Sequence, residues 1–329
     1  MKDFCIIGSG IAGSTIANLL AKKYSVEIFD KARGPGGRSS NRRYKQNLSF
    51  DHGLQYISPE SNNFKKFILD LEKKNILKEW LGNHLDFTFV KKKKSTKYIG
   101  VKGNNDICKY LIKNIQSSFL SEVTSIKFNS IYWTITLNNR DRVFFKNLIL
   151  TCPFPQLKKL CNKYLNRKIL DINFQMVPNI TVMSAYKDSK HVPISTIRFN
   201  DPVIAWASQE NTKNRFKSNQ ILWTIQCTEK FSRQSINFFK KNKKKYEHFV
   251  LKKFEELTGY QAKNSVFQSI HGWKYAYKKQ EASGLESFWL NKYRLGVCGD
   301  WFSGNKAEHA WLSANNLFFK TKKNLLRKI

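Results

Sequence analysis

Acidic residues are scarce in this sequence of 329 residues. It contains 24 Asp and Glu residues against 58 Lys and Arg residues, which gives a formal net charge of +34 at pH 7. An excess of this kind is typical of proteins that bind nucleic acid or an anionic membrane surface. Yet the cations are spread over the whole chain, and no helix-turn-helix, zinc-finger or RNA-binding motif accompanies them. We interpret most of them as solvated side chains that favour an anionic small substrate, with weak polyanion binding as the alternative.

Long hydrophobic runs are absent as well. No apolar stretch reaches the roughly 18 residues that a membrane span needs. The first apolar run begins at Phe4 and is soon broken by glycines, unlike the core of a signal peptide. We therefore expect a soluble, cytoplasmic protein. With 41% hydrophobic and 14% aromatic residues, the chain can bury a large core, which we expect to be divided between two joined domains.

Cysteine and histidine are too few and too scattered to indicate a metal site. The six cysteines lie far apart, no CxxC pair occurs, and no cysteine has a histidine at metal-ligand spacing. We predict reduced cysteines inside the core and no bound metal.

The first thirty residues carry a dinucleotide-binding pattern. A short apolar run, DFCII, leads into Gly8-x-Gly10-x-x-Gly13, and a helical pattern separates it from a second apolar run, SVEIFD. This order predicts a β-α-β unit whose glycines form the first strand-to-helix turn, where backbone N–H groups and the positive end of the helix bind a pyrophosphate. Asp30 lies 22 positions after Gly8, the spacing of a carboxylate that accepts hydrogen bonds from ribose hydroxyls. An acid there disfavours the 2′-phosphate of NADP.

Two further segments favour FAD over NAD. In DKARGPGGR, Gly37 lets the backbone approach a bulky ligand, and Arg38 can neutralise phosphate charge. Near the end of the chain, the apolar run RLGVC leads to Gly299 and Asp300, where a carboxylate can bind a polyol hydroxyl. A helix expected to begin near Ala307 would direct its N–H groups at a reduced flavin. A nicotinamide cofactor needs no such second contact.

The rest of the chain predicts further elements from its periodicity. Residues 155–268 alternate short apolar runs with polar loops, which indicates a separate domain that covers the substrate. Regular elements are expected in five segments: helices over 61–80, 104–116, 233–257 and 307–326, and three strands over 122–153.

With these motifs, the sequence resembles the FAD-dependent amine-oxidase superfamily and, within it, the bacterial renalase-like oxidoreductases. The resemblance covers nearly the whole chain and rests on GSGIAGSTIA, DKARGPGGR, FDHGLQYI, ILTCPFPQ, AWASQENTKNR, ILWTIQCT, IHGWKYA and GVCGDWFSGNKAEHAWLSA. It implies an α/β (α+β) fold: a Rossmann-like FAD-binding domain of the p-hydroxybenzoate-hydroxylase type with an inserted mixed-sheet substrate domain. The implied bounds are 1–60, 100–155 and 270–329 for the FAD-binding domain, and 61–99 and 156–269 for the substrate domain.

The resemblance also implies which residues hold a non-covalent FAD. The glycine turn and Arg38 would hold the pyrophosphate, Asp30 the adenosine ribose, and the backbone of Val123 the adenine. Asp300 would bind the ribityl chain, and the loop into the last helix would face the pyrimidine edge of the flavin. The implied cofactor-binding residues are Gly8, Gly10, Ile11, Ala12, Gly13, Asp30, Lys31, Gly37, Arg38, Val123, Gly299, Asp300, Glu308, His309 and Ala310.

The activity that the resemblance implies is oxidation of the 2- and 6-dihydro isomers of NAD(P)H to NAD(P)⁺. Hydride would pass to flavin N5, and dioxygen would reoxidise the flavin and release hydrogen peroxide. Two alternatives stay open: a flavin amine oxidase or desaturase with another small substrate, and a non-catalytic basic flavoprotein that binds polyanions. The expected catalytic residues are His271, Gln55 and Tyr56, and the expected substrate-binding residues are Trp206, Gln209 and Trp273.

Two residues depart from the family pattern. His309 stands where relatives have a glycine beside the flavin, and Leu54 replaces a smaller residue. The histidine would either crowd the cofactor or hydrogen-bond its carbonyl, so it bears on the substrate assignment more than on flavin binding.

Overall fold

The structure is a computed structural model of the chain. It describes residues 1–45, 47–86, 95–138, 140–172, 175–187, 193–279 and 284–326. The lysine run at 91–94 and the last three residues lie outside this part. None of the described helices is long and apolar enough to cross a membrane.

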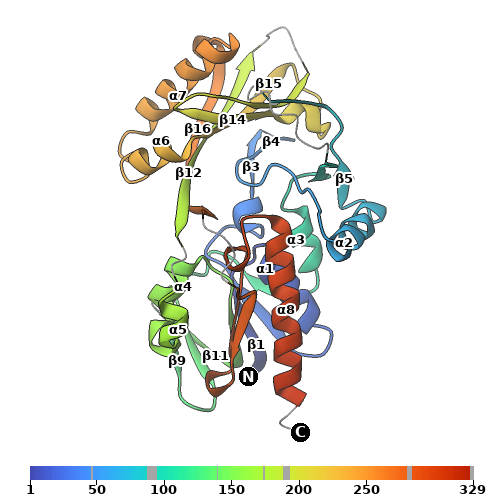
Figure 1. Ribbon diagram of the computed structural model, residues 1–329, viewed down its shortest axis with the longest axis vertical. Coiled ribbons are helices and arrows are strands. Elements are labelled where there is room, and N and C mark those ends of the chain that lie inside the picture. The colour runs from blue at the N-terminus through green and yellow to red at the C-terminus, as the bar shows by residue number, and fades with distance from the viewer. Residues whose placement is uncertain are drawn as a thin grey trace.

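An eight-stranded sheet forms one half of the molecule, the lower half in Figure 1. Its central strands β11, β1 and β2 are parallel, as expected from their apolar sequences. A path of neighbouring strands runs β17-β18-β11-β1-β2-β8, and β10 and β9 extend the sheet from the first half of β11. The bounds are β1 (Lys2–Ile7), β2 (Val26–Phe29), β8 (Gln116–Ser118), β9 (Val123–Phe128), β10 (Trp133–Leu137), β11 (Asp141–Leu150), β17 (Ser287–Leu290) and β18 (Leu295–Cys298).

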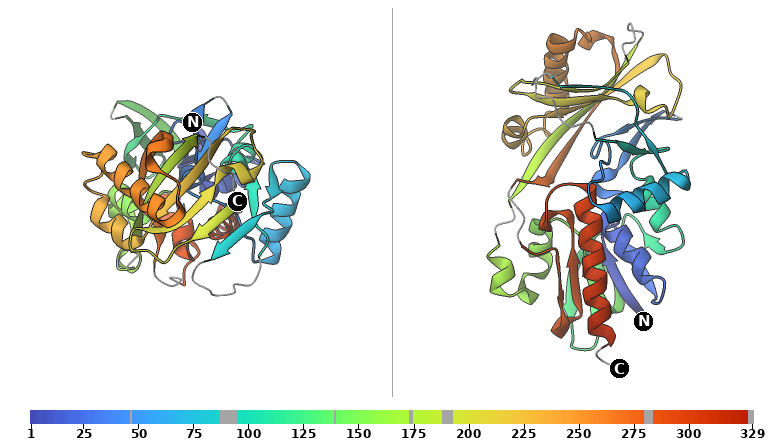
Figure 2. Two further views of the ribbon diagram at one scale, coloured as in Figure 1. Left: turned by 90° about the horizontal axis from the view of Figure 1, so that it is seen from above. Right: turned by 45° about the vertical axis from the view of Figure 1, so that its right-hand side comes forward.

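Helices cover both faces of this sheet (Figure 2). One core joins the first strands to α1, α2, α3 and α8, and a second core joins the opposite face to α4 and α5. The rings of Phe67 on α2 and Trp311 on α8 stack at 5.3 Å. The bounds are α1 (Ile11–Leu20), α2 (Asn62–Lys73), α3 (Asp106–Leu111), α4 (Phe154–Cys161), α5 (Arg167–Leu170) and α8 (Ala307–Leu326).

A six-stranded sheet forms the other half, with the order β16-β12-β15-β14-β13-β6. Helices α6 (Glu229–Ser235) and α7 (Lys243–Thr258) cover one face, where residues such as Trp223 and Phe254 are buried. The strands are β6 (Asn83–Asp86), β12 (Met176–Lys187), β13 (Ile194–Arg198), β14 (Ile204–Gln209), β15 (Gln220–Cys227) and β16 (Ser265–Lys278).

Two small antiparallel pairs lie between the large sheets (Figure 1). Strands β3 (Asn41–Lys45) and β4 (Leu48–Asp51) form a hairpin against the uncovered face of the six-stranded sheet, where Phe50 packs with Met183 and Leu222. Strand β5 (Leu77–Glu79) pairs with β7 (Tyr98–Gly100). The short 3-10 helices are η1 (Gly37–Ser39), η2 (Asn162–Tyr164), η3 (Glu210–Lys213), η4 (Ala262–Asn264), η5 (Asn291–Tyr293) and η6 (Asp300–Phe302).

Most predicted elements are confirmed, and several segments differ. The helix predicted over 61–80 ends at Lys73 and is followed by β5, and the helix predicted over 104–116 covers only Asp106–Leu111. The N-terminal β-α-β unit, the three strands within 122–153 and the helix 307–326 are present. The single helix expected over 233–257 is instead α6 and α7, because the chain turns between them to pack Phe239 against Gly272. The implied FAD-binding domain includes residues 270–278, but these residues form the second half of β16 in the six-stranded sheet. The implied substrate domain includes α2, but α2 packs in the first core, against the eight-stranded sheet.

Candidate active site

The glycine turn between β1 and α1 is tightly packed. A Cβ added to Gly13 would lie 1.9 Å from the carbonyl oxygen of Gly8, and Gly8 itself has φ +102°, a conformation that favours glycine. Gly10 caps α1 and pairs with Gly36 through an isolated bridge. Because these glycines carry no side chains, a phosphate can approach the first N–H groups of α1 closely.

Asp30 holds this turn in place at the end of β2. Its Oδ2 accepts hydrogen bonds from the Ser9 N–H at 2.8 Å and the Ser9 hydroxyl at 2.6 Å, and its Oδ1 accepts one from the Ala32 N–H at 2.8 Å. The Ser121 N–H donates to the Asp30 carbonyl, so the chain that enters β9 at Val123 lies beside the acid. A carboxylate has about four acceptor positions, so Oδ1 can accept one further hydrogen bond.

Arg38 and Asp300 meet across the molecule although 262 positions separate them in the sequence. One guanidinium nitrogen lies 2.5 Å from Asp300 Oδ1, and another donates to the Ala276 carbonyl at 3.0 Å. Gly37 lies next to Gly10, because a Cβ on Gly37 would approach the Gly10 Cα to 3.3 Å. The structure thus gathers the glycine turn, Arg38 and Asp300 at the carboxyl edge of the parallel strands, where such sheets bind dinucleotides.

Two of the predicted cofactor-binding residues, Glu308 and His309, lie in the first turn of α8. The Glu308 carboxylate accepts hydrogen bonds from the Glu60 and Ser61 N–H groups at 2.7 Å each, so this side chain ties α8 to the start of α2 rather than facing a ligand. His309 Nδ1 accepts from the Lys306 N–H at 3.2 Å, which leaves the proton of the neutral ring on Nε2. Partial burial and the Lys306 charge lower the pKa of His309.

Three rings from both halves of the molecule form a cluster next to this edge. The His52 ring stacks on the Trp273 indole at 5.1 Å and meets the His271 ring edge-on at 4.8 Å. His271 and Trp273 lie 4.3 Å apart on the same face of β16. The Trp273 indole N–H donates to the His52 carbonyl at 2.9 Å. Sequence reasoning selected His271 and Trp273 but missed His52, which follows Asp51 directly in the quoted segment FDHGLQYI.

Both histidines of the cluster are uncharged at neutral pH. Burial, His271 and Arg42 lower the pKa of His52 to about 3. Burial and the cations Arg42, Lys240 and Lys243 lower the pKa of His271 to about 4. The cluster therefore presents neutral imidazole and indole surfaces, and neither histidine is poised as an acid or base near pH 7.

Next to the ring cluster lies a buried ionic network that sequence reasoning missed. Lys213 Nζ lies 2.8 Å from Asp51 Oδ2 and 2.9 Å from Glu210 Oε2, and all three side chains are at most 1% exposed. Arg215 reaches the same Asp51 oxygen at 2.5 Å. Burial raises the pKa of Glu210, whereas Arg215 and Lys213 hold the pKa of Asp51 below its ordinary value despite burial.

Gln55 belongs to this network rather than to an open surface. Its amide nitrogen donates to the Asp51 carbonyl, and its oxygen accepts from the Ser208 hydroxyl at 2.8 Å and from Lys213 at 3.2 Å. With 6% exposure, its side chain is in position to orient the loop rather than to contact a substrate.

The other predicted substrate residues separate into two groups. Trp206 pairs with Gln226 on the face toward the ring cluster, because the Gln226 amide donates to the Gly53 carbonyl at 2.9 Å. Gln209 pairs with Trp223 and is fully buried on the opposite face, so its predicted substrate contact requires a correction. Tyr56 follows Gln55 directly in the chain, and its ring packs against Trp80 with 6.2 Å between the ring centroids.

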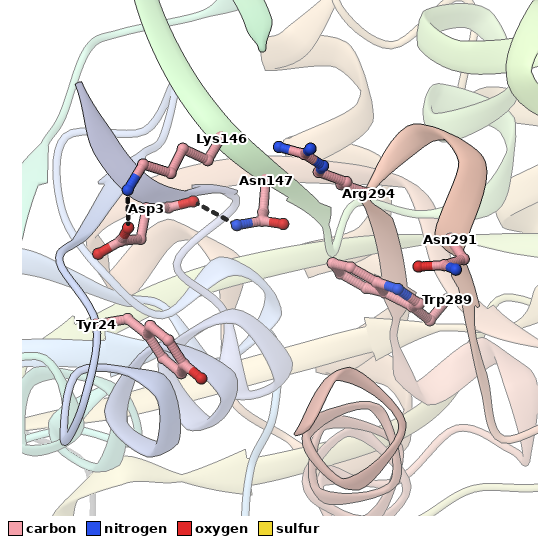
Figure 3. Close-up of a pocket in the computed structure, with 7 residues that line it drawn as sticks. All are labelled: Asp3, Tyr24, Lys146, Asn147, Trp289, Asn291 and Arg294. Atoms are coloured by element: carbon pink, nitrogen blue, oxygen red, sulfur yellow. Dashed lines mark hydrogen bonds and ion pairs between the residues drawn. The ribbon is translucent and has the colours of Figure 1, made fainter. Parts of the chain in front are cut away.

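A cavity of about 250 Å³ lies at the other end of the eight-stranded sheet (Figure 3). Figure 3 shows Lys146 directed at Asp3, with 2.9 Å between the charged atoms, and Asn147 donating to the Asp3 carbonyl. It lies at the amino ends of the parallel strands, opposite the glycine turn, and is separate from the candidate site. Its lining residues are Asp3, Tyr24, Lys146, Asn147, Trp289, Asn291 and Arg294.

The buried imidazole of His52 predicts acid-sensitive stability. Between pH 6.5 and 5 the unfolded chain binds a proton at this histidine and the folded chain does not, so stability falls as pH falls. One unit of pKa difference corresponds to about 1.4 kcal/mol, so the loss over this interval is about 2 kcal/mol. The substitution His52→Phe, which keeps a ring in the cluster, should remove that part of the pH dependence of the free energy of unfolding in urea.

The control for this experiment is His248→Phe, at an exposed position on α7. It should reproduce the wild-type loss between the two pH values. If His52→Phe shows the full wild-type loss, His52 accepts a proton in the folded protein and the cluster is not neutral.

The sequence and the fold are both similar to those of known proteins. Residues 6–71 match the family described as an NAD(P)-binding Rossmann-like domain. Renalase of Mus musculus is 25% identical over 177 residues, which cover 50% of this chain and 51% of renalase. The chain spans only between 51% and 59% of the length of the curated relatives that it matches.

Two solved structures are similar over nearly their whole length. A protein of Exiguobacterium sp. 255-15, assigned as a protoporphyrinogen oxidase, has a TM-score of 0.73 at 11% identity and covers 98% of this chain and 99% of its own. Wild-type putrescine oxidase bound to putrescine has a TM-score of 0.68 at 11% identity, with 99% of both chains covered. Identities this low establish the fold alone. The implied fold class is confirmed: the chain contains a Rossmann-like domain and has the fold of these two solved oxidases.

Proposed function

We propose that this protein is an FAD-dependent oxidoreductase of the renalase-like kind, which oxidises 2- and 6-dihydronicotinamide dinucleotides to NAD(P)⁺. The observation that carries the proposal is the convergence of the Gly8–Gly13 turn, Arg38 and Asp300 at one edge of the eight-stranded sheet. Backbone N–H groups, a cation and a carboxylate are the groups that a flavin dinucleotide needs for its phosphates and hydroxyls.

Each part of the FAD would be held by a different segment of the chain. The glycine turn and Arg38 would hold the pyrophosphate, Asp30 and the chain near Val123 the adenosine, and Asp300 the ribityl hydroxyls. Bound FAD would supply a two-electron hydride acceptor that dioxygen reoxidises. His309 offers an Nε2 proton to a flavin carbonyl at the start of α8.

The ring cluster provides the surroundings that this oxidation needs. An activated dihydropyridine releases hydride without a strong base, so alignment and exclusion of water matter more than proton transfer. The indole of Trp273 and the neutral imidazoles of His52 and His271 give a flat, weakly polar surface for an aromatic ring. Trp206 lies on the same side of the six-stranded sheet.

Anaerobic stopped-flow of the purified yellow protein tests the proposal. Flavin absorbance should bleach rapidly with 2- or 6-dihydroNAD and slowly or not at all with NADH or putrescine. Rapid bleaching by putrescine alone would favour an amine oxidase, the alternative suggested by the likeness to putrescine oxidase. A flavin that no donor reduces, together with salt-sensitive RNA binding, would favour the non-catalytic alternative.

Arg38→Ala tests the flavin site itself. Without the guanidinium, a phosphate loses a charge-assisted hydrogen bond, so FAD affinity should fall about 30-fold, which corresponds to about 2 kcal/mol. The measurement is FAD titration of deflavinated protein by isothermal calorimetry. Arg33→Ala, an exposed arginine of the same segment, is the matched control and should retain wild-type affinity. Equal affinity of the Arg38 and Arg33 variants would remove Arg38 from the phosphate site.

The cysteines support the cytoplasm as the location. All six are free thiols, and burial raises the pKa of Cys108 to about 11 and that of Cys152 to about 12. Buried, protonated thiols without disulfide partners suit a reducing compartment.

A further inference from the structure

The ring cluster lies on the edge strand of the six-stranded sheet. In the strand order, β16 is the outermost strand, with β12 as its neighbour. Side chains alternate between the two faces of a strand, so His271 and Trp273 face the β3–β4 hairpin and Gly272 faces α6 and α7. Segments from both sides can therefore approach His271 around this edge.

On the first side, the hairpin brings Arg42 to the cluster. The Tyr44 ring packs on Phe267 of β16 at 4.2 Å, and Phe50 of the same hairpin stacks on Phe267 at 5.6 Å. Arg42 pairs with Phe50 across the hairpin and therefore lies on the same face of it as Phe50. Its exposed guanidinium acts electrostatically on both His52 and His271.

On the second side, the turn between α6 and α7 brings two lysines. A Cβ added to Gly272 would lie 2.4 Å from the Phe239 ring and 2.8 Å from Ile236, so this turn packs directly on β16. Lys240 follows Phe239 at once, and Lys243 begins α7. Both lysines are exposed, and both contribute to lowering the pKa of His271.

The charges around His271 have one sign. Arg42, Lys240 and Lys243 act on its imidazole, whereas Asp51, the acid that acts on the neighbouring His52, is already paired with Lys213 and Arg215. None of the three cations forms an ion pair with another described residue. Three exposed cations next to an uncharged aromatic surface are complementary to a ligand with a neutral ring and an anionic group, and they repel a cationic amine.

We propose that Arg42, Lys240 and Lys243 bind the phosphate groups of the substrate while its ring lies against His271 and Trp273. This inference deepens the proposed function and rests on it for the identity of the ring. The phosphate anchor also selects dinucleotides over nucleosides and over the diamines that proteins of this fold oxidise. We call Arg42, Lys240 and Lys243 the phosphate anchor.

ADP-ribose is the probe for the phosphate anchor, because it carries the pyrophosphate and lacks a reducible ring. Its binding to the FAD-loaded protein is measured by isothermal calorimetry, with flavin absorbance confirming that the cofactor site stays filled. Arg42→Gln and the double variant Lys240→Gln/Lys243→Gln should each weaken binding about tenfold and reduce its dependence on salt. The double variant Lys241→Gln/Lys245→Gln removes two exposed charges from the same segment and should bind as the wild type does.

The reduction assay separates failure of the phosphate anchor from failure of the proposed function. With dihydroNAD, loss of an anchor cation should raise the half-saturating concentration about tenfold and leave the limiting rate of flavin reduction unchanged. If dihydroNAD reduces the flavin but ADP-ribose binds all variants equally, the anchor is refuted and the function stands. If ADP-ribose binding depends on Arg42 but dihydroNAD does not reduce the flavin, the anchor stands and the function is refuted.

Discussion

Replacing Lys213 with methionine is expected to lower the free energy of unfolding by about 3–5 kcal/mol, the usual cost of removing one partner from a buried ion pair. The ammonium group lies within 2.9 Å of both Asp51 and Glu210, and its side chain has no exposed surface. Methionine would fill the space but leave two buried carboxylates with Arg215 as the one remaining cation that pairs with them among the described residues. Urea unfolding followed by tryptophan fluorescence measures the change.

Two further variants show whether charge balance is the cause. Lys213→Met combined with Glu210→Gln removes one charge of each sign and leaves the Asp51–Arg215 pair, so it should recover at least half of the loss. Lys74→Met breaks an exposed pair with Asp70 on α2 and should change stability by less than about 1 kcal/mol. A loss below about 1 kcal/mol for Lys213→Met alone would show that the network is hydrated or rearranges.

The ionic network also explains how the ring cluster is held in place. Asp51 and Gln55 flank His52 on the chain that leaves the hairpin, while Glu210 and Lys213 come from η3, which follows β14. The network therefore fixes the loop of one half of the molecule to the other half. Trp273 and Gln226 also hold this loop through the His52 and Gly53 carbonyls, so loss of Lys213 should loosen the substrate surface without releasing it.

The sequence predicts the nucleotide-binding half well because its signals are local. Gly8, Gly10 and Gly13 directly precede their helix, and Asp30 follows its strand at a fixed spacing, so a β-α-β unit and its ligand can be inferred from one short segment. The meeting of Arg38 with Asp300 is less direct, because no local pattern shows that the two ends of the chain touch. There the family resemblance was needed.

The substrate side is harder to predict for two physical reasons. In AWASQENTKNR the charged residues look like a solvated loop. Contacts with segments distant in the sequence bury them: Asp51 pairs with Lys213 and Arg215, and the Trp80 ring lies 5.3 Å from the Lys213 ammonium. The position of Gln209, in contrast, could have been predicted. Trp206 and Gln209 are three positions apart on one strand, so they face opposite sides of the sheet.

Gly13→Ala is the second substitution with a large expected effect, and its cause is steric. In a helix, alanine is more favourable than glycine by about 1 kcal/mol. Here the steric clash of the added methyl group should outweigh this gain. The added methyl group would lie 1.9 Å from the Gly8 carbonyl oxygen and 3.0 Å from the Thr151 hydroxyl. Gly8 cannot move aside freely, because its N–H donates to the Phe29 carbonyl at 2.9 Å. We expect a loss of about 3 kcal/mol in the free energy of unfolding.

Gly34→Ala is the matched control, because no atom lies within 4 Å of its added Cβ. Alanine reduces the conformational entropy of the unfolded chain, so this variant should have an unchanged free energy of unfolding or one raised by about 0.4–1 kcal/mol. The two variants also differ in what they do to the cofactor: widening the turn at Gly13 separates the N–H groups of α1 from a phosphate, so FAD should be lost from Gly13→Ala and retained by Gly34→Ala. Wild-type stability of Gly13→Ala with full flavin content would mean that α1 can shift away from β1, and that close contact at this turn does not hold the phosphate site together.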